Sequence, residues 1–450
     1  MSYQMQRMVL VALVVGLGQP VVAAAQTPSK AQLQSEVERL QRELDVLKAQ
    51  LARSHPQTQP TTISGQKLAH TPPTQTGTVA AKKKKPRSTS ALTIGGGLVT
   101  EYQYQRPDNT GGHLILDYLD LNVHGYYGKH WTYAADERFS TVNIKNHAYL
   151  HYGWFAYNFG KRYQQQQIKF GLFHEPFGNL PYGYDSFWGS LAYYAGFTDH
   201  QGAGVGYRLQ DGPWQVNLAA FKNDNLGQPS TYAGGVPTDG YHSDNGGAVR
   251  LAYHWRGNAR DHHAVFSVAA KGGQLQAGDR QGSRWAVTAA MDGTWGPWNL
   301  KLQAVDYAYN VPRDAGYGGM LLPRSSIIAE NYGFAYHMPA KGQLYGVSLK
   351  RSFPVRWGPV HTVSLYDDYG YLHVATAGGF NVGSVANPHR VGDVQLNVAG
   401  VEFAANPVYI WADVISGRNA AMAFDGPDDG AWHTRFNLAI GAYFDGTIKN

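Results

Sequence analysis

Apolar and polar residues alternate with a period of two through most of this chain, from residue 91 to its end. In the last such segment Phe436, Ile440 and Phe444 fall on one face, and Arg435 and Asn437 fall on the other. This alternation is typical of β-strands with two unlike faces. The segments are roughly 9–11 residues long, which is the length that a tilted strand needs to cross a bilayer. A sheet in lipid must close on itself, because an open edge leaves unpaired backbone groups in hydrocarbon. The pattern therefore predicts a closed transmembrane β-barrel.

Short turns that contain Gly and Pro beside a Trp separate several of these segments. They lie at residues 211–214, 296–298 and 357–359. Pro is tolerated as the first residue of a strand, and Trp is enriched where a membrane meets water. We interpret these turns as short periplasmic hairpins. We interpret the longer polar segments as external loops, at residues 223–246, 310–326 and 417–431.

Both ends of the chain are expected on the periplasmic side, so the number of strands should be even. Counting gives about 17 segments, but bacterial single-chain barrels have even strand numbers. We predict an all-β fold, a 16-stranded antiparallel transmembrane β-barrel formed by residues 91–450, with 18 strands as the alternative. The region that decides between the two numbers is 310–390.

Composition agrees with a barrel and excludes other classes. Only 16% of the residues are charged, against about 25% in soluble domains, yet the mean hydropathy of −0.37 is too low for a helical membrane protein. Residues 1–90 hold 12 of the 38 basic and 4 of the 32 acidic residues, which leaves 26 basic and 28 acidic residues in the main domain. A near-neutral domain offers no basic face to a nucleic acid. The absence of Cys excludes disulfide scaffolds and thiolate metal sites.

Residues 1–25 have the three parts of a secretory signal peptide. Arg7 supplies positive charge, Met8–Leu17 is the apolar core, and Ala23–Ala25 forms a cleavage site of small residues. The apolar core has about ten residues, too few to span a bilayer. An uncleaved anchor is the alternative interpretation.

Residues 26–54 are predicted to form a short periplasmic coiled-coil helix. Its apolar residues alternate in spacings of four and three, which is the seam of a coiled coil over about three heptads. They are Leu33, Val37, Leu40, Leu44, Leu47 and Leu51. Because so short and polar a helix is marginal alone, we expect partner helices, as in a homotrimer. The alternative is an amphipathic helix that lies on another surface.

Residues 55–90 are predicted to be a disordered basic linker. The segment is rich in Pro, Thr, Gln, Ser and Ala and ends in a basic run, Lys82–Arg87, and such a composition cannot bury a core. We interpret it as a solvated tether. Contact of the basic run with peptidoglycan or with lipid headgroups is the alternative.

Residues 174–201 form a long segment after the fifth predicted strand, which makes them the third external loop. The segment contains eight aromatic residues, whose bulk would be costly to expose to water. A loop of this length is usually functional, so we expect it to fold into the lumen and narrow it. A loop folded over the top of the barrel, or one that grips a neighbouring subunit, is the alternative.

The candidate site residues are those expected at this constriction. On the loop, Glu175, Tyr182, Tyr184 and Asp185 are predicted to shape the eyelet. On the strands, alternation directs basic and acidic side chains inward, a mixed ring that gives a transverse field. The predicted pore-lining residues of the wall are Arg138, Lys169, Arg208, Arg250, Arg284, Asp120 and Asp136.

Several stretches resemble the phosphate-selective porin O and P family. They are Ile168–Gly178, which reads Ile-Lys-Phe-Gly-Leu-Phe-His-Glu-Pro-Phe-Gly, then Gly202–Tyr207, Phe221–Asp224, and Asn397–Val414 with its Asn406-Pro407 turn. The predicted N-terminal coil is similar to that of the dicarboxylate-porin relatives. The resemblance spans about residues 91–446 and implies a 16-stranded, trimeric channel.

Two features depart from the pattern of that family. Segment 174–201 has no Arg or Lys but contains Glu175, Asp185 and Asp199, whereas phosphate selectivity in the family rests on basic residues at the constriction. Six residues also follow Phe444, where barrel proteins often end on an aromatic residue. The resemblance therefore does not fix the substrate.

The sequence favours an outer-membrane porin of a Gram-negative cell, with lipid and lipopolysaccharide as neighbours and passive diffusion of small hydrophilic solutes, among them anions such as phosphate or dicarboxylates. A carbohydrate-conducting pore with an aromatic eyelet and a non-conducting structural or adhesive barrel are the alternatives. No catalytic motif, cofactor or metal site is predicted. His147 and His151, four apart on a strand, lie about 13 Å apart, too far to share an ion.

Overall fold

The computed structural model describes residues 89–449 apart from short gaps. The gaps are 107–111, 140–147, 162–163, 181, 225–241, 278, 312–314, 318–319, 332–333, 384–386 and 421–427. The chain divides into two compact units, Met1–Gln66 and Lys67–Asn450, and all the described residues belong to the second. The predicted signal peptide, coiled coil and nearly all of the linker lie outside them. No helix of the described residues is long and apolar enough to cross a bilayer.

Sixteen strands close into one antiparallel barrel, as the alternation predicts. They are β1 (Ser90–Arg106), β2 (His113–Tyr127), β3 (Trp131–Phe139), β4 (Ala148–Lys161), β5 (Gln164–His174), β6 (Gln201–Asp211), β7 (Trp214–Asp224), β8 (His242–Arg256), β9 (His262–Ala277), β10 (Arg280–Trp295), β11 (Trp298–Asn310), β16 (Lys341–Trp357), β17 (Val360–Val374), β20 (Val394–Ala405), β21 (Val408–Arg418) and β22 (Trp432–Lys449). The predicted number of 16 is confirmed.

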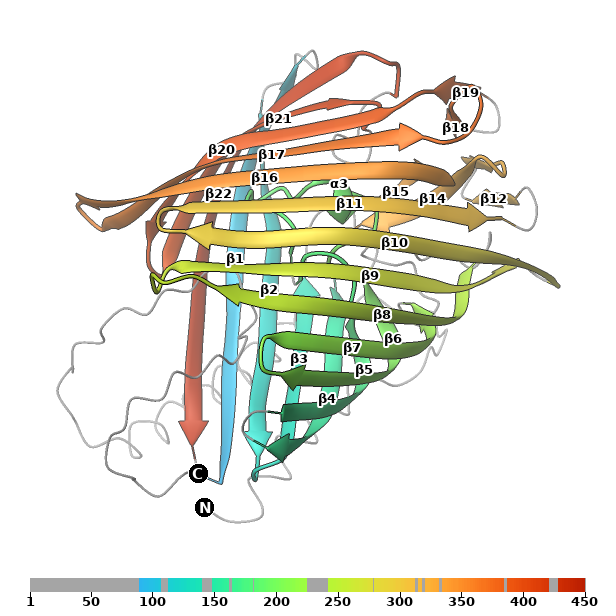
Figure 1. The fold of residues 1–450 in the computed structure, drawn as a ribbon. Coiled ribbons are helices and arrows are strands. Elements are labelled where there is room, and N and C mark those ends of the chain that lie inside the picture. Colours follow the sequence, from blue (N-terminus) through green and yellow to red (C-terminus); the bar gives the residue numbers. More distant parts are fainter. Residues whose placement is uncertain are drawn as a thin grey trace, which may run out of the picture. The chain divides into compact units, whose positions relative to one another are not determined.

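The first and last strands close the barrel along their whole length. β1 pairs with β22 from Ala91 opposite Lys449 to Arg106 opposite Thr434, and Figure 1 shows the two strands side by side. Asp445–Lys449, which follow Phe444, therefore continue the last strand and pair with the start of the first.

Region 310–390, which was to decide between 16 and 18 strands, contains short strands that are not part of the barrel. Six short strands pair only with each other, in three hairpins outside the barrel sheet. They are β12 (Ala315–Tyr317) with β13 (Met320–Leu322), β14 (Ser326–Asn331) with β15 (Phe334–Pro339), and β18 (Phe380–Gly383) with β19 (Pro388–Val391). The connection between β11 and β16 thus reaches residue 340, beyond the end predicted for that loop at 326.

The tight turns follow from their glycines. Gly212, Gly296 and Gly358 have φ between 55° and 58° and connect β6 to β7, β10 to β11 and β16 to β17. A positive φ at the first central position suits the hairpin turns whose twist matches that of the strands. The predicted hairpins are therefore confirmed.

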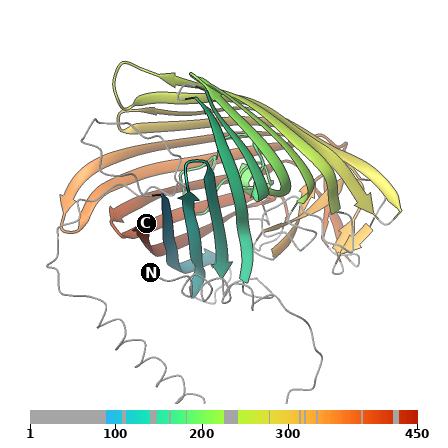
Figure 2. The ribbon, with the colours of Figure 1, turned by 90° about the horizontal axis from the view of Figure 1, so that it is seen from below.

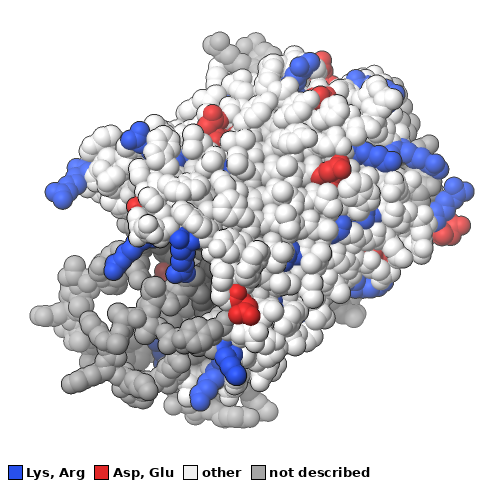
Figure 3. Space-filling view, viewed as in Figure 1, with Lys and Arg blue, Asp and Glu red and all other residues white. Residues whose placement is uncertain are grey.

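The two faces of the strands differ as the alternation requires. In β22, Phe436, Ile440 and Phe444 are exposed on the outer face, while Arg435 and Asn437 are buried inside the barrel. Large apolar side chains are exposed along the outer faces of the other strands as well. One face of the molecule is accordingly mostly uncharged, with scattered charged side chains (Figure 3).

Candidate functional site

The inserted segment, residues 175–200, leaves β5 and returns to β6 through the lumen. Figure 2 shows it as a green coil within the strands. It contains a single helical turn, α3 (Leu191–Tyr194), which the hydroxyl of Ser190 caps by accepting a hydrogen bond from the Tyr193 backbone. The position predicted for this loop after the fifth strand is confirmed.

Apolar contacts hold one part of the inserted segment against the wall. Phe177, Tyr193, Tyr194 and Phe197 are buried, and the ring centroid of Phe197 lies 4.9 Å from that of Tyr307 on β11. Such aromatic pairs stabilise a contact beyond the area they bury. Half of the eight aromatic residues are thus packing residues with little surface left for a solute.

A glycine on the wall makes room for α3. A Cβ atom built on Gly370 of β17 would lie 2.4 Å from Cβ of Leu191, which is closer than side-chain atoms approach. The helical turn and the strand therefore fit only because that position has no side chain.

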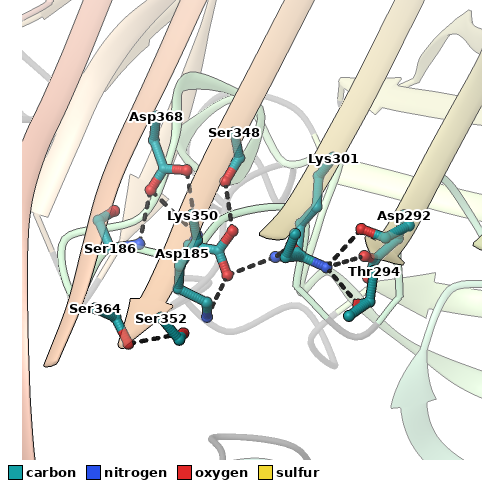
Figure 4. Close-up of polar contacts among 12 residues, drawn as sticks. Asp185, Ser186, Asp292, Thr294, Lys301, Ser348, Lys350, Ser352, Ser364 and Asp368 are labelled. Atoms are coloured by element: carbon teal, nitrogen blue, oxygen red, sulfur yellow. Dashed lines mark hydrogen bonds and ion pairs between the residues drawn. The ribbon is translucent and has the colours of Figure 1, made fainter. Parts of the chain in front are cut away.

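Asp185 is the centre of the strongest polar contact, called here the Asp185 anchor. Its carboxylate lies 2.6 Å from Nζ of Lys301 and 2.6 Å from Nζ of Lys350, and it accepts a hydrogen bond of 2.8 Å from Ser348. Asp368 on β17 in turn accepts hydrogen bonds from the backbone N–H groups of Asp185 and Ser186, the latter at 2.7 Å. Figure 4 shows these groups converging from β11, β16 and β17.

The charges around Asp185 determine its protonation. Burial alone would raise the pKa of this carboxyl, but Lys301 and Lys350 outweigh burial and lower the pKa to about 2. The carboxylate is therefore ionised at neutral pH and compensates two cations of the wall.

Glu175 is compensated in the same manner near the start of the inserted segment. Its carboxylate lies 2.9 Å from Nζ of Lys271, 3.7 Å from Arg284 and 3.7 Å from His200. Burial would raise its pKa, but the neighbouring charges, Lys271 foremost, lower it to about 2. Arg284, predicted to line the wall opposite the loop, instead contacts the loop directly.

The predicted eyelet tyrosines are half-buried and lie next to each other. The ring centroids of Tyr182 and Tyr184 are 5.7 Å apart, and Tyr184 meets Tyr193 edge-on at 5.5 Å. Phe187 and Trp188 are also half-buried. These four aromatic residues are the ones of the inserted segment that keep accessible surface.

Three predicted wall residues form a basic ladder across β5–β8: Lys169 on β5, Arg208 on β6 and Arg250 on β8. Arg208 and Arg250 both lie opposite Asn217 of the intervening strand β7. Lys169 lies opposite Gly206, two residues from Arg208 on the same face. Among the described residues, none of the three has a carboxylate within ion-pair distance.

The neutral contacts of the basic ladder leave its charge uncancelled. Nζ of Lys169 lies 4.1 Å from the ring centroid of Trp154, and Nε of Arg250 donates a hydrogen bond of 3.1 Å to the carbonyl of Gly178. An aromatic ring and a carbonyl hold these cations in place without neutralising them.

The remaining predicted wall residues, two carboxylates and one guanidinium, form a mixed group. Asp120 on β2 lies directly opposite Arg138 on β3, and Nε of Arg138 lies 3.4 Å from Oδ1 of Asp136. The predicted wall residues are thus divided in space, with charges of both signs at β2–β3 and basic side chains alone at β5–β8.

Sequence reasoning missed a cluster of His151, His174 and Asp199. Nε2 of His151 lies 3.1 Å from Oδ1 of Asp199, and His174 also contacts that oxygen. His147, considered as the partner of His151, lies outside the described residues. The three residues are 23–48 positions apart, and only strand pairing brings them together, so no spacing in the sequence signals them. Lys271, Lys350 and Asp368 were missed for the same reason.

Comparison with solved structures supports the fold. The outer membrane channel DcaP of Acinetobacter baumannii is 13% identical, with a TM-score of 0.52, and the match covers 81% of this chain and all of that one. The anion-selective porin from Comamonas acidovorans is also 13% identical, with a TM-score of 0.51, over 79% of this chain and all of that one. No family model matches the chain, and no curated protein sequence matches it significantly. The resemblance to the phosphate-selective porin O and P family therefore stays a prediction.

Proposed function

We propose that this protein is an outer-membrane porin through which small hydrophilic solutes diffuse, with a preference for anions. The observation that carries the proposal is the distribution of charge around the inserted segment. The carboxylates of Glu175 and Asp185 are compensated by cations of the wall, while the basic ladder has no described acidic partner. The lumen near the ladder is therefore positive, although the segment itself contains only acidic charges.

The fold is consistent with this proposal. A closed barrel with an apolar outer face is one of only two architectures that satisfy backbone groups in lipid. Basic residues that line a constriction favour anions because they replace part of the hydration of the passing ion. Arg208 and Lys169 would supply this field, and Tyr182 and Tyr184 would limit the size of the solute.

The experiment that tests the proposal is the reversal potential of single channels in a planar bilayer under a salt gradient. The double variant Lys169→Glu/Arg208→Glu is expected to shift the reversal potential toward cations. The matched control is Arg351→Glu/Arg356→Glu, which makes the same change of charge at two exposed residues of β16 and is expected to leave the potential near that of the parent. Equal selectivity in all three proteins would contradict the anion preference.

A carbohydrate pore is the second candidate, because four aromatic residues of the inserted segment keep accessible surface. Sugar rings stack on such faces, and Phe187 is held in place by the buried Trp411 of the wall, whose ring centroid lies 5.2 Å from its own. Block of the ion current by oligosaccharides, removed in Phe187→Ala, would favour this candidate. A folded barrel without conductance would favour a structural role instead.

We further propose that the protein is a homotrimer. The predicted heptad seam in residues 29–54 supports it, because a short coil needs partner helices. Native mass spectrometry in detergent tests the stoichiometry, and removal of residues 26–54 separates a trimer held by the coil from one held by the barrels.

A further inference from the structure

Three metal-ligand side chains converge where the inserted segment joins the wall, and we call them the neck cluster: His151 on β4, His174 at the end of β5, and Asp199 just before β6. Their ligand atoms all lie within 4.8 Å of one another. Asp199 is 1% exposed, and the side chain of His174 is 19% exposed, so the cluster is enclosed but has one side that an ion can reach.

The backbone of Asp199 and the side chain of Gln201 are two further features of the neck cluster. Asp199 has a φ of 54°, a left-handed conformation that is uncommon for a non-glycine residue and is found at functional sites. Gln201 places its side-chain amide nitrogen 2.9 Å from Nε2 of His151 and 3.0 Å from Asp199. Rotation of that amide would present its oxygen as a fourth ligand.

A carboxylate also lies behind one of the imidazoles. Oδ1 of Asp136 is 3.6 Å from Nδ1 of His151, on the side of the ring opposite Asp199. Histidines that bind metals almost always direct their second nitrogen to a carboxylate, a carbonyl or water, which fixes the ring and raises its basicity. His151 lies between two carboxylates in this way, with Nε2 toward Asp199 and Nδ1 toward Asp136.

We propose that the neck cluster binds one divalent transition-metal ion, with Zn²⁺ as the best fit. Two imidazoles and a carboxylate suit Zn²⁺, Ni²⁺ or Cu²⁺, whereas Ca²⁺ and Mg²⁺ prefer sites made of oxygen alone. Tetrahedral Zn²⁺ with bonds near 2.0–2.1 Å holds its ligand atoms roughly 3.3 Å apart. His151 and Asp199, at 3.1 Å, already have this separation, whereas His174 would have to move away from Asp199 and to a matching distance from His151, whose ligand atom lies within 4.8 Å of its own.

A bound ion would link the two ends of the inserted segment to the barrel wall. His174 and Gln201 face each other as the last register pair between β5 and β6, so the cluster joins both ends of the segment to β4. The ion would therefore fix the constriction without contributing to the charge at the Asp185 anchor.

The direct test is metal binding by the full-length folded protein, purified in detergent without a histidine tag and freed of metal. Isothermal titration with ZnCl₂ is expected to give one site per chain. The variants His174→Ala and Asp199→Asn are expected to abolish this site. Asp136→Asn is expected to weaken it about 10–100-fold, the usual effect of removing a partner of a ligand.

The matched control is His262→Ala/His263→Ala, which removes two adjacent histidines at the start of β9, away from the cluster. This variant is expected to bind Zn²⁺ like the parent. Loss of binding in the control, or unchanged binding in His174→Ala and Asp199→Asn, would overturn the proposal and assign the ion to surface histidines.

Two further measurements use only the parent protein, so their outcome does not depend on whether the variants fold. Co²⁺ in the parent protein is expected to give the visible absorption of a four-coordinate ion with nitrogen and oxygen ligands, and Zn²⁺ is expected to displace it. Zn²⁺ should also raise the unfolding temperature of the parent, since a ligand of the folded state stabilises it. A six-coordinate Co²⁺ spectrum with no effect of Zn²⁺ on unfolding would contradict the site.

Discussion

The inserted segment meets the barrel wall in two different ways on two sides of the lumen. Toward β9–β17 its carboxylates form close ion pairs, with Asp185 between Lys301 and Lys350. Toward β5–β8, away from the neck cluster at its two ends, the described part of the segment accepts a hydrogen bond from Arg250, and the basic ladder has no acidic partner among the described residues. The same residue types thus serve two purposes. A cation beside a buried carboxylate fixes the position of the chain, while a cation without one leaves its field available to solutes.

The largest effect is expected from reversing the charge of the Asp185 anchor. Asp185→Lys places three cations together where one anion held two, and breaking a buried ion pair costs about 3–5 kcal/mol. We expect the inserted segment to leave the wall, so that single-channel conductance rises and the channel becomes noisy. Asp185→Asn, which keeps the shape, is expected to have a weaker effect. A parent-like conductance in Asp185→Lys would mean that the ion pairs do not hold the segment.

Acid should weaken the same anchor without a mutation. The pKa of Asp185 is about 2 in the structure, against about 3.9 for a free Asp. A carboxyl whose pKa is lowered stabilises the attached state at pH values above the free value, and this stabilisation is lost as the pH falls from about 4 toward 2. Channel noise should therefore increase below pH 4 in the parent, while Asp185→Asn should be noisy already at pH 7. An identical pH response in both proteins would assign the effect to other groups.

Steric packing on the same side should matter somewhat less. Gly370→Val adds atoms where Leu191 of α3 leaves no room, and overpacking of this kind costs about 1–3 kcal/mol. Gly346→Val is the matched control, because Gly346 lies opposite Gly370 in the sheet and a Cβ atom there would meet only an oxygen at 3.9 Å. We expect higher conductance in the first variant alone. Equal effects would indicate that valine disturbs the strands rather than α3.

The smallest effect on the position of the segment is expected from the basic ladder. Arg208→Ala removes a cation that makes no ion pair with the described carboxylates, so unfolding and conductance noise should stay as in the parent. Only the reversal potential should move, toward cations, by less than in the double charge reversal. A rise in noise would show that Arg208 also holds the segment and would remove the distinction between the two sides.

The alternation of the sequence predicted much of the fold for a simple physical reason. A strand has a period of two, so Phe436 and Arg435 must point to opposite sides, and lipid accepts only the first. The strand number followed from the requirement for an even count. The hairpins β12–β13, β14–β15 and β18–β19 are also built of β-strands, which pair with each other and not with the barrel, and the alternation alone does not give these pairing partners.

The sequence predicted which side chains face the lumen, but not which residues they contact there. Period two placed Arg284 and Lys169 inward, but it gives neither the height of a residue in the barrel nor its angle around it. Asp185 and Lys350 are 165 positions apart, and their contact depends on the path of the inserted segment through the lumen. For this reason Arg284 was expected on the wall opposing the loop residues, whereas it lies 3.7 Å from Glu175.

The pairing of β1 with β22 makes this barrel a circle in which the first and last strands are neighbours. Ala91 lies opposite Lys449, so in a variant without residues 1–90 a short linker could join these strand ends, and new termini could be opened at the Gly358–Pro359 turn. Such a circular permutant would retain every strand neighbour while changing which strand is made last. Its yield of folded barrel, relative to the parent, would reveal whether assembly depends on the order of synthesis or only on the final set of neighbours.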